Sequence, residues 1–229
     1  MTDDERLVKA ARRLSESLSP GDLDHVLERI TAAAVELIPD VDYASITIQR
    51  ADGTLHTAAP TDELLCELDA AQYELQEGPC YEAAVTTSHV TSQDLANDER
   101  FPKYGAVAAA AGIHSQAGIR LYDVPGSGQG ALNLYSRRPG TLGELGSLGA
   151  LFADKSSTAI AYAHELAGER EASRTRESVG KAVGVTMERY EFTDERAFAF
   201  LTRLAQHHGV PLPVVADAIV SASRTRGDG

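Results

Sequence analysis

A long stretch without proline constrains this chain more than any other feature. No proline occurs between Leu142 and about Arg176, and apolar residues return there at a helical, heptad-like spacing. Glycines inside the stretch weaken a helix without ending it. At about 1.5 Å per residue the helix would be roughly 50 Å long. That length exceeds what one small domain can bury, so the stretch predicts a helix that joins two domains or pairs with a second copy. The stripe consists of Leu148, Phe152, Ala159, Tyr162 and Leu166, interrupted by Lys155.

Three amphipathic segments follow this stretch. Apolar residues from Val179 to Tyr190 fall on one helical face. Thr193 is placed to cap a second helix, and Gly209 is the residue type that ends one. Pro213 suits the first turn of a third helix. The pattern predicts an all-α bundle of three short helices. A bundle of this size is marginal alone and should lean on a preceding helix or a second subunit.

The chain before residue 142 alternates between helical and strand patterns. This mixture predicts an α+β domain with an antiparallel sheet and flanking helices. Ala51-Asp52-Gly53 marks a hairpin turn between its first two strands, and Gly126 to Gly130 joins its last two. Expected helices cover residues 7–18, 22–38, 60–75, 80–85 and 104–111, and expected strands cover 43–49, 54–58, 89–91, 113–122 and 131–136.

Composition limits the class of protein. The length of 229 residues fits two small domains better than one. No apolar run is long enough to span a membrane, and the charged N-terminus resembles no signal peptide, so we expect a cytoplasmic protein. Two cysteines are too few for a disulfide framework.

Charge is distributed unevenly. The formal net charge is −13, of which −12 lies in residues 1–164 and −1 in residues 165–229. The acidic first part disfavours non-specific binding to nucleic acid, whereas the nearly neutral last part leaves such binding open. An ordinary solvated helix face explains the charge split equally well.

Four segments in the first part of the chain occur in the order and spacing of a known family. They read YASITI, QEGPCYEAAVTTSHVTSQDLANDERFPKY, GIHSQAGIRLYD and GALNLYSRRPG. On these segments residues 23–165 resemble a GAF domain, a small ligand-sensing α+β fold. The resemblance implies a sensor for an unknown small ligand or protein.

The last part resembles the ANTAR domain of bacterial transcription antiterminators over residues 166–220. The chain would then divide into an N-terminal helix (1–22), a GAF domain (23–165) and an ANTAR domain (166–229), as in actinobacterial signalling proteins. The resemblance implies binding to paired RNA stem-loops in leader transcripts, and we expect a homodimer formed through the N-terminal and long connecting helices. The matching positions are Arg176, Val179, Gly180, Ala182, Gly184, Val185, Met187, Ala197, Phe198, Leu201, Arg203, Val215 and Ala216.

Two positions depart from the ANTAR pattern. Val183 stands where the family has lysine, and Thr186 where it has leucine. Lys181 lies two residues before the lysine position, about 200° away around a helix, and does not replace it. A domain that has lost RNA binding and serves protein interaction is therefore an alternative.

RNA recognition needs cations for phosphates and flat side chains for unpaired bases. The same side chains could instead be solvated charges, ion-pair partners or parts of the bundle core. DNA binding by a helix-turn-helix is a further alternative, but the second helix offers Phe198 and Phe200 rather than base-reading polar residues. The RNA-binding candidates are Arg174, Arg176, Lys181, Arg189, Tyr190 and Arg203, with Phe192 as a second stacking candidate.

The sequence shows no catalytic signature, no metal-ligand spacing and no cofactor motif, so we predict neither an enzyme nor a cofactor. Cys80 follows Gly78-Pro79, where we expect a helix to begin and a thiolate to be stabilised, which makes it a candidate redox sensor. Some GAF-like domains reduce methionine sulfoxide with cysteines, and only Cys80 could serve such an activity. Cys66 falls among leucines, so we expect it in the core.

Overall fold

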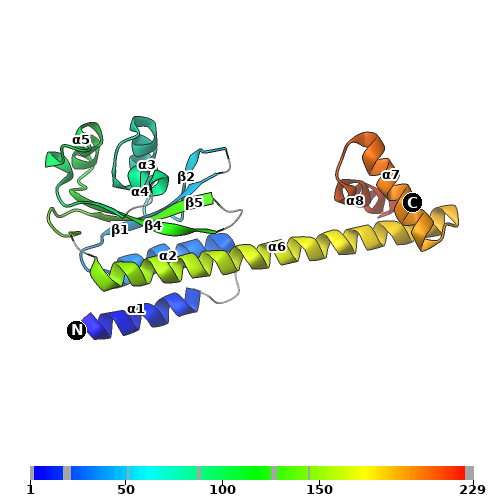
Figure 1. Cartoon of the computed structure of the whole chain (residues 1–229), viewed down its shortest axis with the longest axis horizontal. Helices are drawn as coiled ribbons and strands as arrows, with labels where there is room; N and C mark the ends of the chain where they lie inside the picture. The colour runs from blue at the N-terminus through cyan, green and yellow to red at the C-terminus, as the bar shows by residue number, and fades with distance from the viewer. Residues whose placement is uncertain are drawn as a thin grey trace. The chain divides into compact units, whose positions relative to one another are not determined.

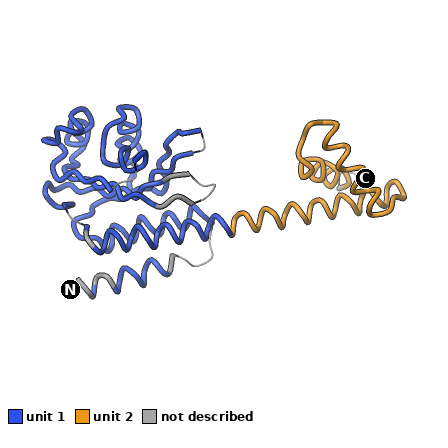
Figure 2. Tube along the Cα trace, viewed as in Figure 1, with its two compact units in different colours: residues 1–165 blue, residues 166–229 orange. Residues whose placement is uncertain are grey.

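A computed structural model describes residues 3–17, 22–50, 52–86, 89–124, 128–143 and 145–224. The chain divides into two compact units, residues 1–165 and 166–229 (Figure 2). One helix, α6 (Gly146–Tyr190), contributes residues to both units. The predicted helix in this region was too short, because nothing between Arg176 and Val179 ends it.

The first unit is built on a five-stranded sheet. Its strands follow the order β2-β1-β5-β4-β3, and all neighbouring pairs are antiparallel (Figure 1). The predicted hairpin and the predicted pairing of the two longest strands are both confirmed. Residues 125–127 of the second connection lie outside the described residues. The strands are β1 (Tyr43–Gln49), β2 (Leu55–Ala58), β3 (Val90–Ser92), β4 (Ser115–Val124) and β5 (Gly128–Ser136).

Helices cover both faces of the sheet. On one face lie α2 (Leu23–Leu37) and the first part of α6, and α1 (Asp3–Ser17) packs on α2 (Figure 1). On the other face lie α3 (Leu64–Leu75), α4 (Pro79–Val85) and α5 (Pro102–Ala110), with a short 3-10 helix, η1 (Leu95–Asn97), beside α5. Each face has its own apolar core, so the sheet is buried on both sides.

Two expectations for α3 were wrong. The helix starts at Leu64 rather than at residue 60, because Thr61 pairs with Ala44 of β1: its N–H donates to the Ala44 carbonyl (2.9 Å) and its Oγ1 accepts from the Ala44 N–H (2.9 Å). Cys66 is exposed rather than in the core. The buried face of α3 carries two leucines followed by Asp69 and Gln72, so polar residues concealed the true stripe.

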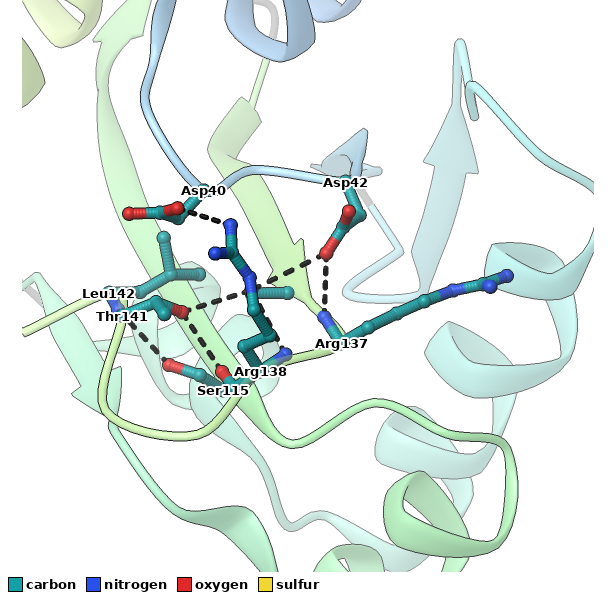
Figure 3. A network of polar contacts seen from close by, with 8 residues as sticks. Asp40, Asp42, Ser115, Arg137, Arg138, Thr141 and Leu142 are labelled. Atoms are coloured by element: carbon teal, nitrogen blue, oxygen red, sulfur yellow. Dashed lines mark hydrogen bonds and ion pairs between the residues drawn. The ribbon is translucent and has the colours of Figure 1, made fainter.

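A polar network holds the end of β5 beside the turn that precedes β1 (Figure 3). The Arg137 N–H donates to the Asp42 carboxylate (2.7 Å), and the Arg138 guanidinium pairs with Asp40. The Leu142 N–H donates to Ser115 Oγ of β4 (3.3 Å). These bonds fix the segment that leads from the sheet toward α6.

The second unit comprises the later part of α6, α7 (Asp194–His208) and α8 (Leu212–Arg224). Thr193 caps α7 by accepting from the Arg196 N–H (3.4 Å), and Gly209 ends it with φ 64°, as the sequence predicts. The segment predicted as a separate first helix of the bundle is instead the end of α6. The shared core consists of Ala182, Val183, Ala197, Leu201, Ala205, Val215 and Ala216.

Candidate functional site

The first unit contains a buried hydrogen-bond network centred on Asp69. Helix α3 directs this carboxylate at the sheet, where it accepts from Ser45 of β1 (2.9 Å), Thr57 of β2 (3.0 Å) and Tyr135 of β5. Gln72 adds a weaker bond from its amide nitrogen (3.3 Å). One carboxylate therefore connects α3 to three strands.

Burial controls the protonation of Asp69. Loss of solvent raises its pKa to about 6, and the hydroxyl groups of Tyr135, Ser45 and Thr57 oppose that rise by stabilising the charge. None of its described hydrogen-bond partners is a cation. The carboxylate is therefore poised to gain or lose a proton near neutral pH.

Cys80 belongs to the same network. The Gln116 amide donates to its Sγ (2.6 Å), the Tyr135 hydroxyl lies 3.5 Å from it, and its own N–H donates to Gln72 Oε1 (3.0 Å). The side chain is fully buried, and burial together with the Asp69 charge raises the pKa of the thiol. We expected the start of α4 to stabilise a thiolate, and the structure gives the opposite direction.

Helix α4 closes over this region. A Cβ built on Gly118 of β4 would lie 2.5 Å from the Pro79 carbonyl oxygen and 2.7 Å from the Ala83 Cβ, so α4 rests directly on the sheet. Beneath it, the Asn133 amide nitrogen donates to Ser45 Oγ (3.0 Å) and to Thr47 Oγ1 (2.8 Å). Asn133 Oδ1 is buried and has no partner among the described residues. The polar groups beneath α4 are thus hydroxyl, amide and carboxyl groups, which can donate or accept hydrogen bonds.

Arg174 and Lys181 of the second unit line one cleft of about 270 Å³ between α6 and α8. Glu177 and Asp217 line the same cleft. Lys181 Nζ lies 2.5 Å from Glu177 Oε1, and the Ser178 hydroxyl donates to Asp217. The two cations are therefore brought together, but beside two carboxylates.

Arg189 and Tyr190 form a second group at the end of α6. The Arg189 guanidinium lies 5.9 Å from the centre of the Tyr190 ring, which contacts Phe192 and Phe200. Among the described residues, Arg203 shows only a bond within α7, from its Nε to the Ala199 carbonyl (3.3 Å).

Arg176 is exposed but lies about 200° from Arg174 around the helix, so the two do not share a face. Val183, at the position of the family lysine, is buried in the bundle core. The lysine position of this chain therefore presents no charge to solvent.

The Asp69 network was missed from the sequence. The available signal was Asp69 and Gln72 at helical spacing after Leu65 and Leu68, where a core stripe should continue. Arg196, which lies on the Phe200 face of α7, was also overlooked as a binding candidate. Within the described residues, no group of side chains has the composition of a metal site, and no helix is long and apolar enough to cross a membrane.

Comparison with family models gives two matches. Residues 21–161 match the GAF domain, and residues 169–220 match the ANTAR domain. No curated protein matches this chain.

Several solved structures share the fold of the first unit. A free methionine-R-sulfoxide reductase from Neisseria meningitidis is 13% identical, with a TM-score of 0.55 over 72% of this chain and 96% of that one. The N-acylhomoserine lactone dependent LuxR family transcription factor CepR2 from Burkholderia cenocepacia is 18% identical, with a TM-score of 0.54 over 69% and 94%.

The GAF domain of a phosphoenolpyruvate-protein phosphotransferase from Coxiella burnetii is 17% identical, with a TM-score of 0.51 over 76% of this chain and 99% of that one. Identities this low establish the fold alone. Because the GAF model covers more than half of the residues, the chain belongs to the GAF domain family and carries an ANTAR domain after it.

Proposed function

We propose that this chain is an RNA-binding regulator of transcription antitermination, in which the GAF domain controls the ANTAR domain. A GAF sensor followed by an ANTAR output fits a signal-responsive regulator. RNA stem-loops in leader transcripts are the proposed target of the output. The input is a small ligand or a protein that acts on the GAF domain.

One observation carries the RNA proposal: the segment that matches ANTAR has its own apolar core and exposes cations around it. Arg174, Arg176 and Arg189 are exposed and form no ion pair with any described residue. Guanidinium groups outside ion pairs can exchange solvent for phosphate without first separating from a carboxylate. Residues 165–229 carry a net charge of only −1, so this part of the chain itself adds little repulsion toward RNA.

A homodimer would strengthen such binding. A single bundle presents few free cations, and the cleft with Lys181 already contains two carboxylates. Two bundles that engage two stem-loops gain affinity through effective concentration, without new contacts. We propose dimerisation through α1 and α6, which sedimentation of the purified chain would test.

The Asp69 network is the proposed region of GAF input. Among the described residues of the first unit, it brings several buried polar side chains together beneath α4. A ligand that offers matching donors and acceptors could replace internal hydrogen bonds at little net cost. Isothermal titration with metabolite pools, comparing the wild type with Asp69→Ala, would identify such a ligand.

The test of RNA binding is a gel shift of the full chain with leader RNA from the source organism. The variant Arg174→Ala/Lys181→Ala is compared with Arg50→Ala/Lys103→Ala, which removes the same charge from exposed positions of the GAF unit. We expect the first variant to weaken binding about tenfold and to lower the salt dependence by one to two phosphate contacts, each worth a slope of about 0.7–0.9.

Two outcomes would contradict the proposal. If the wild type shifts no structured RNA, RNA binding is excluded and a protein-interaction role is favoured. If duplex DNA competes as well as hairpin RNA, the chain is a DNA-binding regulator.

A further inference from the structure

Three aromatic rings form one cluster in the second unit, which we call the aromatic platform: Tyr190, Phe192 and Phe200. The Tyr190 and Phe192 rings are stacked, with centroids 5.6 Å apart and an angle of 29°. Phe200 lies 5.7 Å from Tyr190 and 6.1 Å from Phe192. Phe192 and Phe200 are half-buried against the bundle core, whereas Tyr190 remains 49% exposed. Phe192 and Phe200 therefore hold the platform against the bundle core, and the Tyr190 ring is accessible to solvent.

The backbone builds this platform at the junction of α6 and α7. Helix α6 ends at Tyr190, and Glu191 adopts φ 55°, a left-handed conformation that few residues other than glycine adopt. The Phe192 N–H then donates to the Met187 carbonyl (3.2 Å), which draws Phe192 back toward the helix end. A tight, defined turn therefore sets the ring positions, which is what a preorganised binding surface requires.

One arginine contacts the platform, and two more share a helix face with Phe200. The Arg189 guanidinium lies 5.9 Å from the Tyr190 ring centre. Arg196 is four residues before Phe200 and Arg203 three after it, so both share its face of α7. None of these three guanidinium groups has a carboxylate partner among the described residues. The acidic residues Asp194 and Glu195 lie six and five positions before Phe200, on other sides of the helix.

We propose that the aromatic platform binds an unpaired base of RNA, which stacks on Tyr190 while Arg189, Arg196 and Arg203 contact the adjoining phosphates. This inference rests on the proposed RNA binding and assigns its base-contacting site. Every base presents a flat π-face, and free guanidinium groups provide the charge complementarity for the backbone. The cleft with Arg174 and Lys181 lacks aromatic side chains and contains carboxylates, so it is suited to at most a phosphate contact. The expected occupant of the platform is a loop nucleotide, because bases inside a duplex are already stacked.

The chain provides a matched control for this site. Phe198 is 47% exposed, almost the same fraction as Tyr190, and lies on α7 two residues before Phe200. Two residues correspond to about 200° of rotation, so Phe198 points away from the platform. Removing either ring deletes a similar exposed apolar surface, but only one change affects the platform.

The experiment measures binding of hairpin RNA with a randomised loop, the same loop sequence without its stem, and a fully paired duplex. Full-length wild type, Tyr190→Leu, Tyr190→Phe and Phe198→Leu are compared, and circular dichroism checks that each folds. We expect Tyr190→Leu to weaken hairpin binding about tenfold or more, as stacking of one base requires. Tyr190→Phe keeps the ring and should bind as the wild type does, and Phe198→Leu should change affinity less than threefold. A 2-aminopurine placed in a selected loop should be quenched by the wild type and not by Tyr190→Leu.

Each contrary outcome is distinct. Failure of the wild type to bind any hairpin overturns the proposed function itself. Hairpin binding that Tyr190→Leu leaves intact overturns only the platform, as does an equal loss for Phe198→Leu. If Tyr190→Leu keeps RNA affinity but changes the sedimentation coefficient, the platform is a contact between proteins rather than a base site.

Discussion

Tyr135 of β5 donates its hydroxyl hydrogen to the carboxylate of Asp69 on α3, and both side chains are fully buried. This bond joins the centre of the sheet to the helices above it. Ser45 of β1 and Cys80 of α4 also approach the same tyrosine oxygen, so the pair is linked to one further strand and one further helix.

Asp69 should make stability depend on pH. Its pKa is about 6 in the folded chain and 3.8 for an ordinary aspartate, so the folded chain keeps a proton that the unfolded chain loses. The stability contributed by this group is therefore full below about pH 4 and lost as pH rises through about 6. A difference of about two pKa units corresponds to as much as ~3 kcal/mol.

Urea unfolding of the wild type and Asp69→Asn between pH 4 and 7 checks this, because the asparagine cannot titrate. Glu74→Gln, an exposed change on the same helix, serves as control. A wild type and Asp69→Asn whose stabilities run parallel across this range would contradict the assignment.

Two glycine substitutions should act in opposite directions. In Gly118→Ala the new Cβ would meet the Pro79 backbone and the Ala83 side chain at less than 3.0 Å, so the variant should lose about 2 kcal/mol or more of unfolding free energy. Gly168 lies within α6 with nothing within 4 Å of an added Cβ, so Gly168→Ala should gain up to about 1 kcal/mol in its helix. Chemical denaturation monitored by circular dichroism measures both, and equal effects would show that α4 is not seated on β4.

The two cysteines should differ strongly in reactivity. Cys66 is exposed, whereas Cys80 is fully buried with its thiol held protonated. Titration of the native chain with Ellman's reagent should release about one equivalent quickly, and the second only after urea is added. In Cys66→Ser the fast phase should disappear. A fast phase that persists in this variant would mean that Cys80 is accessible, and would revive the redox role.

The cap of α7 gives a prediction for the second unit. Thr193→Ala removes the acceptor of the Arg196 N–H and should cost about 1 kcal/mol. Thr202→Ala removes a hydroxyl that bonds to the Phe198 carbonyl within the helix, and should be neutral or slightly stabilising. Thermal unfolding of both variants tests the assignment, which fails if Thr202→Ala is the more damaging.

Most of the fold could be predicted because its local signals agree. The strand at Tyr43–Gln49 and the ends of α7 at Thr193 and Gly209 lie where alternation and capping chemistry place them. The start of α3 could not be predicted in this way, because a hydrogen bond between Thr61 and the distant Ala44 decides it. The end of α6 at Tyr190 agrees with the predicted stripe, but its continuity across residues 176–179 was missed, because the sequence shows no positive signal there that two predicted helices are one.

The candidate sites were predictable in part. The cations of α6 can be read from the sequence. Which of them lie together depends on their phase around the helix and on the position of α8, whose Asp217 accepts a hydrogen bond from Ser178. The Asp69 network could be predicted only by knowing which face of α3 is buried. On that face a carboxylate occupies a position where the helical pattern predicts an apolar residue. Both features depend on contacts between residues far apart in the sequence. Local patterns do not show such contacts, and the two sites could therefore not be predicted in full.

The orphaned oxygen of Asn133 bears on selectivity. Asn133 Oδ1 is buried and has no hydrogen-bond partner among the described residues, and a buried acceptor left unsatisfied costs about 1–3 kcal/mol. A molecule entering beneath α4 with an N–H or O–H aimed at this oxygen would recover it, whereas an apolar molecule of equal size would not. Because 1–3 kcal/mol corresponds to roughly a five- to 150-fold difference in affinity, we expect the proposed GAF ligand to be selected for a hydrogen-bond donor that reaches Asn133 Oδ1.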